Sequence, residues 1–104
     1  MLTTTMGGRD VHVDRDGFLS RYDDWNEDVA RQLAANINID LTDAHWQAIR
    51  FVREDYTAQG QTPTIERVTV FGHIPEKDLC ALFPELPAVT MAYIAGLPKP
   101  HGYA

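Results

Sequence analysis

The sequence has few of the residues on which metal and thiol chemistry depends. Its single cysteine, Cys80, can form no disulfide within the chain and cannot build a zinc site of several cysteines. The histidines stand at positions 12, 45, 73 and 101, so no two are spaced three or four residues apart on one face of a helix. We therefore expect no metal site and no cofactor.

Long apolar runs, nucleotide-binding loops and an excess of positive charge are missing as well. No stretch approaches about 18 consecutive apolar residues, the length of a membrane-spanning helix, and the first residues lack the apolar segment of a secretory signal. We therefore expect a cytoplasmic protein that does not enter a membrane. The 9 Lys and Arg against 15 Asp and Glu give a net charge of −6, which disfavours binding to nucleic acid. Neither glycine-rich phosphate loops nor nucleophile-elbow patterns occur.

What the sequence contains indicates one domain, residues 1–104, that is mainly α with a small N-terminal β-hairpin (α+β). Val11 and Val13 lie on one side of an alternating stretch, and Asp16-Gly17 favours the positive φ angles of a tight hairpin turn. We therefore place the hairpin around residues 11–19. Residues 1–9 have little pattern, and we expect them to be mobile.

Two longer helices are predicted next. The first starts with Asp24 as N-cap and Glu27 three residues later, and it carries an apolar side chain at every fourth position: Trp25, Val29, Leu33 and Ile37. Thr42 is the candidate N-cap of the second helix, which Gly60 ends, and we expect His45 in its first turn to face solvent or to cap the helix. The apolar stripe of this helix is so broad that it should be covered on more than one side: Ala44, Trp46, Ala48, Ile49, Phe51, Val52 and Tyr56.

Three shorter segments complete the predicted helical bundle. Residues 64–71 can form a helix that Thr64 caps, although their β-branched residues also fit a strand; we favour the helix. The stretch 74–84 predicts a short helix with Pro75 in its first turn. The stretch 88–96 predicts another short helix, which Gly96 ends.

Two sets of side chains in the body are candidates for chemistry or binding. Cys80 lies among apolar residues, a setting typical of a small, buried and unreactive side chain. A reactive thiol would need exposure and a positive neighbour, for which Lys77 is the candidate. Arg50, Arg53 and Arg67 are candidates for an anion-binding or partner-binding patch, although a solvated face with Asp and Glu partners is the commoner arrangement.

The chain ends in a stretch that fits neither a helix nor a strand. Residues 94–104 read IAGLPKPHGYA, with Pro98 and Pro100 two residues apart and a glycine on either side of them. Prolines at this spacing stiffen a chain towards an extended form. We expect a C-terminal arm over residues 96–104 that can lie on the body or swing away from it.

The stretch AGLPKPHGYA resembles the C-terminal signature of the DsrC/TusE family, the sulfur-carrier proteins associated with dissimilatory sulfite reductase, as its gamma subunit, and with tRNA thiolation. That signature reads cysteine, two residues, AGLPKP, one residue, Gly-Cys and a last residue. The stretches DGFL, DW, LTDAHWQAIRFVREDY and LFP are similar to the family too, so the resemblance covers about residues 10 to 104. It implies a helical bundle with an N-terminal β-hairpin, a helix-turn-helix-like segment and a mobile, extended C-terminal arm.

The resemblance also implies a chemistry for which this chain lacks the residues. In the family the penultimate cysteine takes up sulfur as a persulfide, because a thiolate can attack and then hold an electrophilic sulfur atom. That position is Tyr103 here, and the position of the family's second cysteine is Ala92. Since tyrosine forms no persulfide, we expect no catalytic residue. The arm would instead bind a partner through Gly96, Leu97, Pro98, Lys99, Pro100, Gly102 and Tyr103.

Three functions stay open from the sequence. We favour a homologue that is no carrier and no enzyme, and that docks onto protein partners of the sulfur-relay or sulfite-reductase type and regulates them. The second is an active sulfur-relay component that uses Cys80 or acts as a scaffold. The third is a DNA-binding regulator in which the helices around Trp46 and Ile65 form a helix-turn-helix with the three arginines near phosphates. The net charge of −6 argues against the third.

Overall fold

The structure, a computed structural model, describes residues 2–100. Within this range the chain forms a two-stranded sheet, a short 3-10 helix and five α-helices. In chain order the elements are β1 (Leu2–Met6), β2 (Arg9–Val13), η1 (Tyr22–Asp24), α1 (Glu27–Asn36), α2 (Asp43–Gln59), α3 (Ile65–Phe71), α4 (Glu76–Leu82) and α5 (Pro87–Ala95). The predicted fold class, mainly α with an N-terminal β-hairpin, is confirmed.

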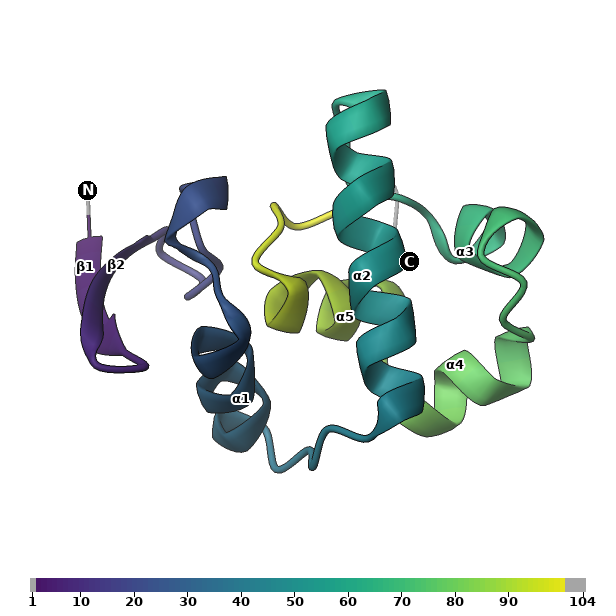
Figure 1. Ribbon diagram of the computed structural model, residues 1–104, viewed down its shortest axis with the longest axis horizontal. Coiled ribbons are helices and arrows are strands. Elements are labelled where there is room, and N and C mark those ends of the chain that lie inside the picture. Colours follow the sequence, from purple (N-terminus) through teal and green to yellow (C-terminus); the bar gives the residue numbers. More distant parts are fainter. Residues whose placement is uncertain (1, 101–104) are drawn as a thin grey trace.

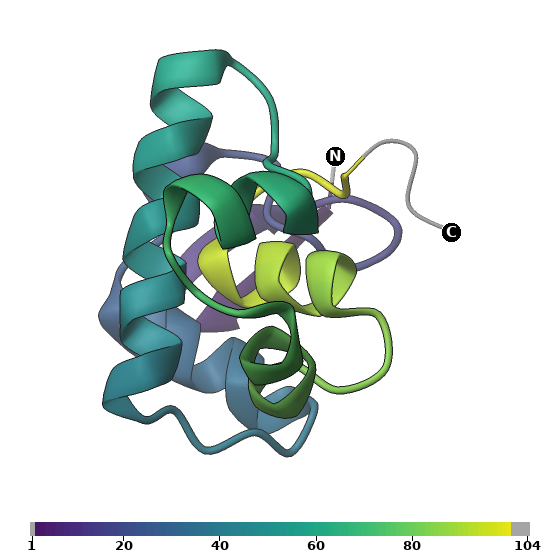
Figure 2. The ribbon, with the colours of Figure 1, turned by 90° about the vertical axis from the view of Figure 1, so that its right-hand side faces the viewer.

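Helix α5 is the buried centre of this arrangement. Figure 1 shows α2 upright in the middle of the molecule, with the hairpin and α1 on one side and α3 and α4 on the other. In the view turned by 90°, α5 lies among α2, α3 and α4 (Figure 2). It contacts α1, α2 and α4, and four of its residues are almost fully buried: Met91, Ala92, Ile94 and Ala95. A helix that is apolar on nearly every side belongs in such a position.

Among residues 2–100, no single helix is long and apolar enough to cross a membrane. Helices α4 and α5 reach that length and apolarity only when they are taken together, and they are bent by 61° at the break between them.

The hairpin is built on a two-residue turn of glycines. Strands β1 and β2 pair antiparallel with Leu2 opposite Val13, and Gly7-Gly8 connects them. The φ angles of the two glycines are 58° and 79°. Two successive positive φ angles match the right-handed twist of the flanking strands, and glycine adopts them at little cost. The Gly-Gly pair therefore fixes where the chain reverses.

The hairpin thus lies earlier in the chain than the sequence predicted, and the prediction around residues 11–19 is wrong in position. The chain does turn at Asp16-Gly17, where the Asp14 carboxylate accepts hydrogen bonds from the N–H groups of Asp16 and Phe18. However, only one bridge, between Val13 and Leu19, closes that loop. The mobility expected of residues 1–9 stays a prediction, although residues 2–6 form a strand.

Helix α1 holds the hairpin to the body. Its N-cap is Asn26, whose side chain accepts a hydrogen bond of 2.8 Å from the Val29 N–H, so the prediction of Asp24 as the cap is wrong. From this start, Val29 and Leu33 face the strands and are completely buried. They belong to an apolar cluster that joins α1 to the hairpin and contains Met6, Val11, Val13, Leu19, Val29 and Leu33.

Asp24 ties β2 to η1 instead of capping α1. Its carboxylate accepts a hydrogen bond of 2.7 Å from the backbone N–H of His12 and lies 2.9 Å from the His12 ring nitrogen Nδ1. These two contacts, the backbone one first, lower the pKa of Asp24 below its ordinary value. The ionised carboxylate is therefore part of the folded structure at this joint.

We expect the substitution Asp24→Asn to lower the free energy of unfolding at pH 5 by about 1.5 kcal/mol, because hydrogen bonds to an ionised group are lost. Since the folded pKa is the lower one, the contribution is present above the unfolded pKa of about 4 and is lost as the pH falls through the folded pKa. Urea unfolding of both proteins between about pH 5 and about pH 2 measures this. A stability difference that stays constant over that range would contradict the role of the ionised carboxylate.

Both predicted ends of α2 are confirmed. Thr42 is the N-cap, and Gly60, with a φ of 76°, is the left-handed C-cap. The His45 side chain completes a capping box: Nδ1 accepts the Thr42 N–H at 3.0 Å, while Nε2 lies 2.8 Å from the Leu82 carbonyl oxygen. Because an amide N–H only donates and a carbonyl only accepts, the ring proton sits on Nε2. Of the two expectations for His45, capping is therefore confirmed, and solvent exposure is wrong because His45 is only 6% exposed.

The three shorter helices are also confirmed, and residues 64–71 form a helix rather than a strand. Thr64 caps α3 by accepting a hydrogen bond from the Arg67 N–H. Pro75 is the N-cap directly before α4, one residue outside the first turn that the sequence predicts for it, and Gly96 ends α5. Between them these helices and α2 bury the main core, whose largest completely buried side chains are Ile49, Val52, Val68, Leu79, Phe83, Met91, Ile94 and Leu97.

Candidate functional site

The C-terminal arm begins at a left-handed turn at the end of α5. Gly96 has a φ of 71°. Its N–H bonds to the Tyr93 carbonyl at 3.3 Å, and the Leu97 N–H bonds to the Ala92 carbonyl at 3.0 Å. This pair of backbone bonds is the Schellman pattern, in which a glycine turns the chain out of the helix axis. The direction in which the arm leaves the body is therefore set by the backbone of residues 92–97.

Two side chains from other elements fix the same turn. Trp25, which follows η1, donates its indole N–H to the Ile94 carbonyl at 2.9 Å, and Arg53 of α2 donates from Nη1 to the Ala95 carbonyl at 2.8 Å. The last carbonyls of a helix have no partner within it, so these two bonds satisfy groups that would otherwise need water. We call Trp25, Arg53, Gly96 and Leu97 the base of the arm.

Arg53 is held tightly in this position. Its guanidinium carbon lies 3.9 Å from the centre of the Tyr22 ring and 4.0 Å from that of the Trp25 ring. Burial lowers the pKa of Arg53, although an arginine stays charged in proteins. A planar cation between two aromatic rings is strongly restrained. Arg53 thus acts as a fixed support for the end of α5.

Beyond the base, the described part of the arm lies on the body. Leu97 is completely buried and Pro100 is buried, while the Thr62 hydroxyl donates a hydrogen bond of 2.7 Å to the Pro98 carbonyl. The Lys99 ammonium lies 3.6 Å from a carboxylate oxygen of Asp16. Of the two positions that the sequence left open, the structure therefore shows the arm against the body as far as residue 100. Gly102 and Tyr103 lie outside the described residues.

This fold and this arm match a known family. A family model described as "DsrC like protein" matches residues 5–103 of the chain. The protein belongs to the DsrC-like family. The resemblance seen in the tail is thereby confirmed over nearly the whole chain.

Individual DsrC-like relatives agree with this assignment. The chain is 41% identical over 103 residues to a sulfurtransferase TusE homolog of Haemophilus influenzae, covering 91% of this chain and 94% of that one. It is 36% identical over 107 residues to the sulfurtransferase TusE of Photorhabdus laumondii, covering 96% of both. Among solved structures, DsrC of Allochromatium vinosum superposes with a TM-score of 0.82 at 34% identity, over 98% of this chain and 97% of that chain. The oxidized gamma-subunit of the dissimilatory sulfite reductase of Archaeoglobus fulgidus superposes with a TM-score of 0.79 at 30% identity, over 99% of this chain and all of that one.

The only cysteine of this DsrC-like chain belongs to α4 and not to the arm, and it lies on the surface. Cys80 lies on α4 and is exposed, whereas its neighbour Leu79 is completely buried. The expectation that Cys80 is a buried side chain is therefore wrong. A seven-residue helix turns one face to the core, and Leu79 occupies that face, so the next residue points outward.

The position at which the family resemblance places a second cysteine is in the core of this protein. Ala92 is 1% exposed, and its carbonyl accepts the Leu97 N–H at the base of the arm. A side chain at this place faces the centre of the bundle while the arm lies as the structure shows it. The Ala92 side chain therefore packs in the core, and its backbone carbonyl supports the arm. Its methyl group offers no reactive atom.

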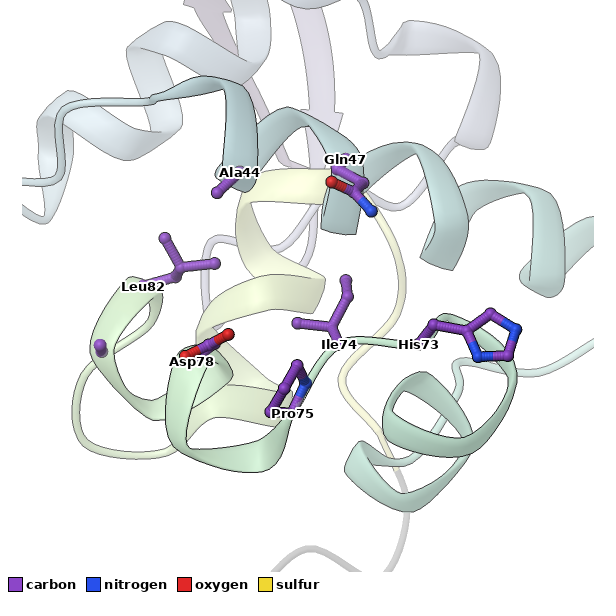
Figure 3. A pocket seen from close by; sticks show the side chains of 8 residues that line it. Ala44, Gln47, His73, Ile74, Pro75, Asp78 and Leu82 are labelled. Carbon is purple, nitrogen blue, oxygen red and sulfur yellow. The ribbon is translucent and has the colours of Figure 1, made fainter.

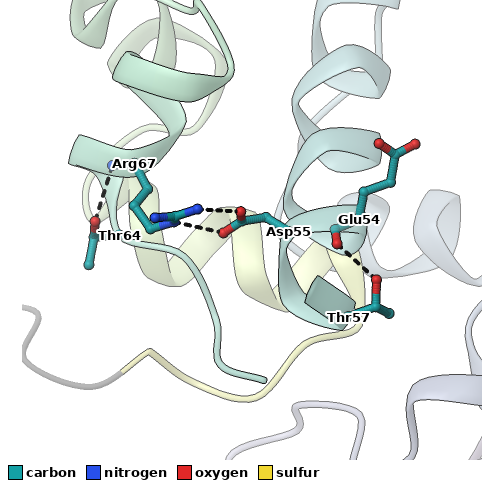
Figure 4. Close-up of polar contacts among 5 residues, drawn as sticks. All are labelled: Glu54, Asp55, Thr57, Thr64 and Arg67. Carbon is teal, nitrogen blue, oxygen red and sulfur yellow. Dashed lines mark hydrogen bonds and ion pairs between the residues drawn. The ribbon is translucent and has the colours of Figure 1, made fainter. Parts of the chain in front are cut away.

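The three candidate arginines have different surroundings. Arg50 is exposed and lines the same pocket as Arg53, whose guanidinium is used at the base of the arm. Arg67 of α3 reaches the Asp55 carboxylate of α2 through two hydrogen bonds, of 2.9 and 2.7 Å (Figure 4). This bidentate contact raises the pKa of Arg67 and ties α3 to α2. A shared anion-binding patch of these three arginines stays a prediction.

The sequence interpretation missed the supports of the arm. The sequence pattern predicts only an apolar packing role for Trp25, and it gives no link between the tail and Asp16 or Thr62. One signal was available, because a tryptophan that is partly buried usually needs a partner for its indole N–H. The identity of that partner, a carbonyl 69 residues further along the chain, is a property of the three-dimensional fold. Within residues 2–100, no three His, Cys, Asp or Glu side chains come together in a way that could hold a metal ion.

Proposed function

We propose that this chain is a docking and regulatory member of the DsrC-like family, which binds the family's protein partners through its arm and transfers no sulfur. The observation that carries this proposal is a contrast within the tail. The base of the arm is built with partly buried, hydrogen-bonded side chains, yet the only cysteine of the sequence is Cys80 on α4. A preserved arm without a carrier thiol suits binding better than group transfer.

The chemistry of sulfur transfer explains why the missing thiol is decisive. An acceptor thiolate attacks the outer sulfur of the donor's persulfide; a new S–S bond forms, the old one breaks, and the donor's thiolate leaves. In this chain the penultimate residue is Tyr103, whose phenol cannot take that role. We therefore assign no catalytic residue and no enzymatic activity to the arm.

The partners are proposed from the names of the relatives. Some of them are called sulfurtransferase TusE, and one is the gamma-subunit of a dissimilatory sulfite reductase. Proteins of the sulfur-relay or sulfite-reductase type are thus the proposed targets. With this role we also propose a cytoplasmic location.

One observation favours a second function. A reactive thiol needs exposure and a positively charged neighbour. Cys80 is exposed, and Lys77 stands one helical turn before it on α4, so the first condition is met and a candidate for the second is present. Cys80 could then accept sulfur in place of the missing tail cysteine. By contrast, the DNA-binding alternative gains nothing from the structure, because Arg53 and Arg67 are engaged with Ala95 and Asp55.

Competition in a reconstituted sulfur transfer tests the docking function. The assay follows the gain of about 32 Da on a cysteine-bearing TusE relative that is supplied by a persulfide-carrying sulfurtransferase. We expect an excess of this chain to slow the transfer, because it occupies the donor without accepting sulfur. Mass action requires an excess on the order of tenfold for clear competition. If a tenfold excess of folded protein does not slow the transfer, docking is contradicted.

The matched control is a chain truncated after Pro100. Truncation after Gly96 is unsuitable, because it removes Leu97 and opens the core, whereas truncation after Pro100 keeps every arm contact described above. If residues 101–104, the end of the arm, are needed for docking, the truncated chain competes much less. Equal competition by both chains would show that residues 101–104 contribute nothing and that docking rests on the part of the chain up to Pro100.

A further inference from the structure

A pocket beneath the turn between α3 and α4 lies far from the arm. It has a volume of about 270 Å³ and is lined by the first two turns of α2, the α3–α4 turn and α4. The arm contacts Thr62, just beyond the other end of α2. Since α2 has 17 residues, the two places are separated by about 25 Å along that helix. In Figure 2 the start of α2 lies at the lower left of the molecule and the arm at the upper right.

The pocket combines an apolar floor with polar walls. Ile74 and Leu82 contribute larger apolar side chains to its lining, which we call the floor, and Ala44 and Ala81 contribute only methyl groups. Figure 3 shows Gln47 on α2 and the Asp78 carboxylate on α4 on opposite sides, with Ile74 between them. The volume lies below the roughly 300–1,000 Å³ of pockets for drug-sized ligands, so it suits a single long side chain.

The polar groups of the pocket have no partners within the described residues. The side chains of Gln47, His73 and Asp78 form no hydrogen bond or ion pair there. By contrast, both oxygens of the Asp55 carboxylate accept hydrogen bonds from Arg67. An amide and a carboxylate that face each other across an apolar floor are therefore available to an incoming group.

The charge of the surroundings selects the kind of group. Asp43, Glu76 and Lys77 stand next to lining residues in the sequence. None of these three side chains, nor that of Asp78, takes part in an ion pair among residues 2–100, and the three carboxylates outweigh the one ammonium. An anion would be repelled by these carboxylates, and a neutral apolar group would cover Asp78 without a compensating bond, which is costly. A cation with an aliphatic stem satisfies both the floor and the walls.

We propose that this pocket binds an arginine side chain presented by a protein partner. The methylene groups of the arginine would cover Ile74 and Leu82, and its guanidinium would donate to the Asp78 carboxylate and the Gln47 amide oxygen. The five N–H groups of arginine point in several fixed directions, so one head group can serve two acceptors on opposite walls. The proposal goes beyond docking by the arm, because it defines a second contact point that does not depend on the tail.

Titration of the ¹⁵N-labelled chain with the peptide acetyl-Ala-Arg-Ala-amide, followed by NMR, tests this inference. We expect weak binding, with chemical-shift changes concentrated at Ala44, Gln47, Asp78 and Ala81. The same peptide with citrulline, a neutral analogue of arginine, should cause almost no change. Equal binding of the citrulline peptide, shifts elsewhere on the surface, or no shifts at all would overturn the proposal.

Two variants separate charge from shape. We expect Asp78→Asn to weaken binding of the arginine peptide by about fivefold, the upper range for a solvent-exposed ion pair. Ala81→Met keeps the charge but fills the pocket, and it should abolish binding. Glu66→Gln on α3 is the matched control, because it removes the same charge from an exposed residue that does not line the pocket. A loss of binding in Glu66→Gln equal to that in Asp78→Asn would show a general charge effect and overturn the site.

Two further results complete the test. The chain truncated after Pro100 should bind the arginine peptide as well as the full chain, so failure of this site and failure of arm docking are distinguishable. In the absence of peptide, the pocket signals should not depend on protein concentration. If they do, the occupant is a second copy of this chain, and the proposed partner is wrong.

Discussion

Replacement of Gly96 by alanine is expected to lower the free energy of unfolding by about 3 kcal/mol. The φ of 71° places this residue in the left-handed region, which costs a residue with a side chain about 1–2 kcal/mol. In addition, a Cβ at this position would lie 2.5 Å from Cδ1 and 2.9 Å from Cγ of Trp25. Relief of that overlap must displace the indole whose N–H bonds to Ile94, and such overpacking costs a further 1 kcal/mol or so at least.

Gly60 supplies a matched control for this prediction. It is also the left-handed cap of a helix, with a φ of 76°, but a Cβ there would meet nothing within 4 Å. Gly60→Ala should therefore cost only the backbone part, about 1 kcal/mol. Urea denaturation of both variants measures the two values. Equal losses would show that the contact between Gly96 and Trp25 does not restrict this position.

The difference between the two glycines bears on function because Gly96 is where the arm starts. The close approach of Trp25 means that the turn is enclosed by the body and is not a loose hinge. Together with Arg53, it determines the direction in which the arm leaves α5. A partner would therefore meet the arm in a restricted set of positions, which lowers the entropic cost of binding.

The helices could be predicted from the sequence because their signals are local. Thr42, Thr64 and Gly60 are cap residues whose effect depends on the backbone within one turn, and each was placed correctly. The N-cap of α1 was missed because Asp24 and Asn26 are both good caps. The choice between them depends on His12 of β2, whose backbone N–H donates a hydrogen bond to the Asp24 carboxylate. Asp24 is therefore used at β2, and Asn26 caps the helix.

The hairpin was misplaced for a related reason. Asp16-Gly17 and Gly7-Gly8 are both turn sequences, and the threonines of β1 offer no apolar alternation that would mark a strand. Only one residue of β1, Met6, is buried. The pairing is decided by packing of the hairpin against α1, which lies too far along the chain for a local pattern to show.

The candidate site, too, could be predicted only in part from the sequence. The tail itself could be recognised, because prolines and glycines at fixed spacing constrain the chain wherever they occur. Its supports, Trp25, Arg53, Thr62 and Asp16, could not, since each is brought to the arm by tertiary packing. Arg53 shows the consequence most clearly: an arginine predicted as a binding group is held between two aromatic rings and bonded to a helix end.

The central claim, that the chain docks but carries no sulfur, predicts an all-or-none difference between two proteins. Wild-type chain incubated with a persulfide-carrying sulfurtransferase should keep its mass. The double variant Tyr103→Cys, Cys80→Ser should gain about 32 Da, and a reducing thiol should remove the addition. The reason is that the variant restores an acceptor thiolate at the position that the family resemblance assigns to the carrier, while it removes the only other thiol.

Intact-mass spectrometry of the wild-type protein after this incubation is the most direct test. The account predicts no sulfur adduct on the wild type under conditions in which a cysteine-bearing TusE relative acquires one. An adduct of about 32 Da on Cys80 of the wild type, absent from Cys80→Ser, would contradict it and would establish the exposed thiol of α4 as a sulfur carrier.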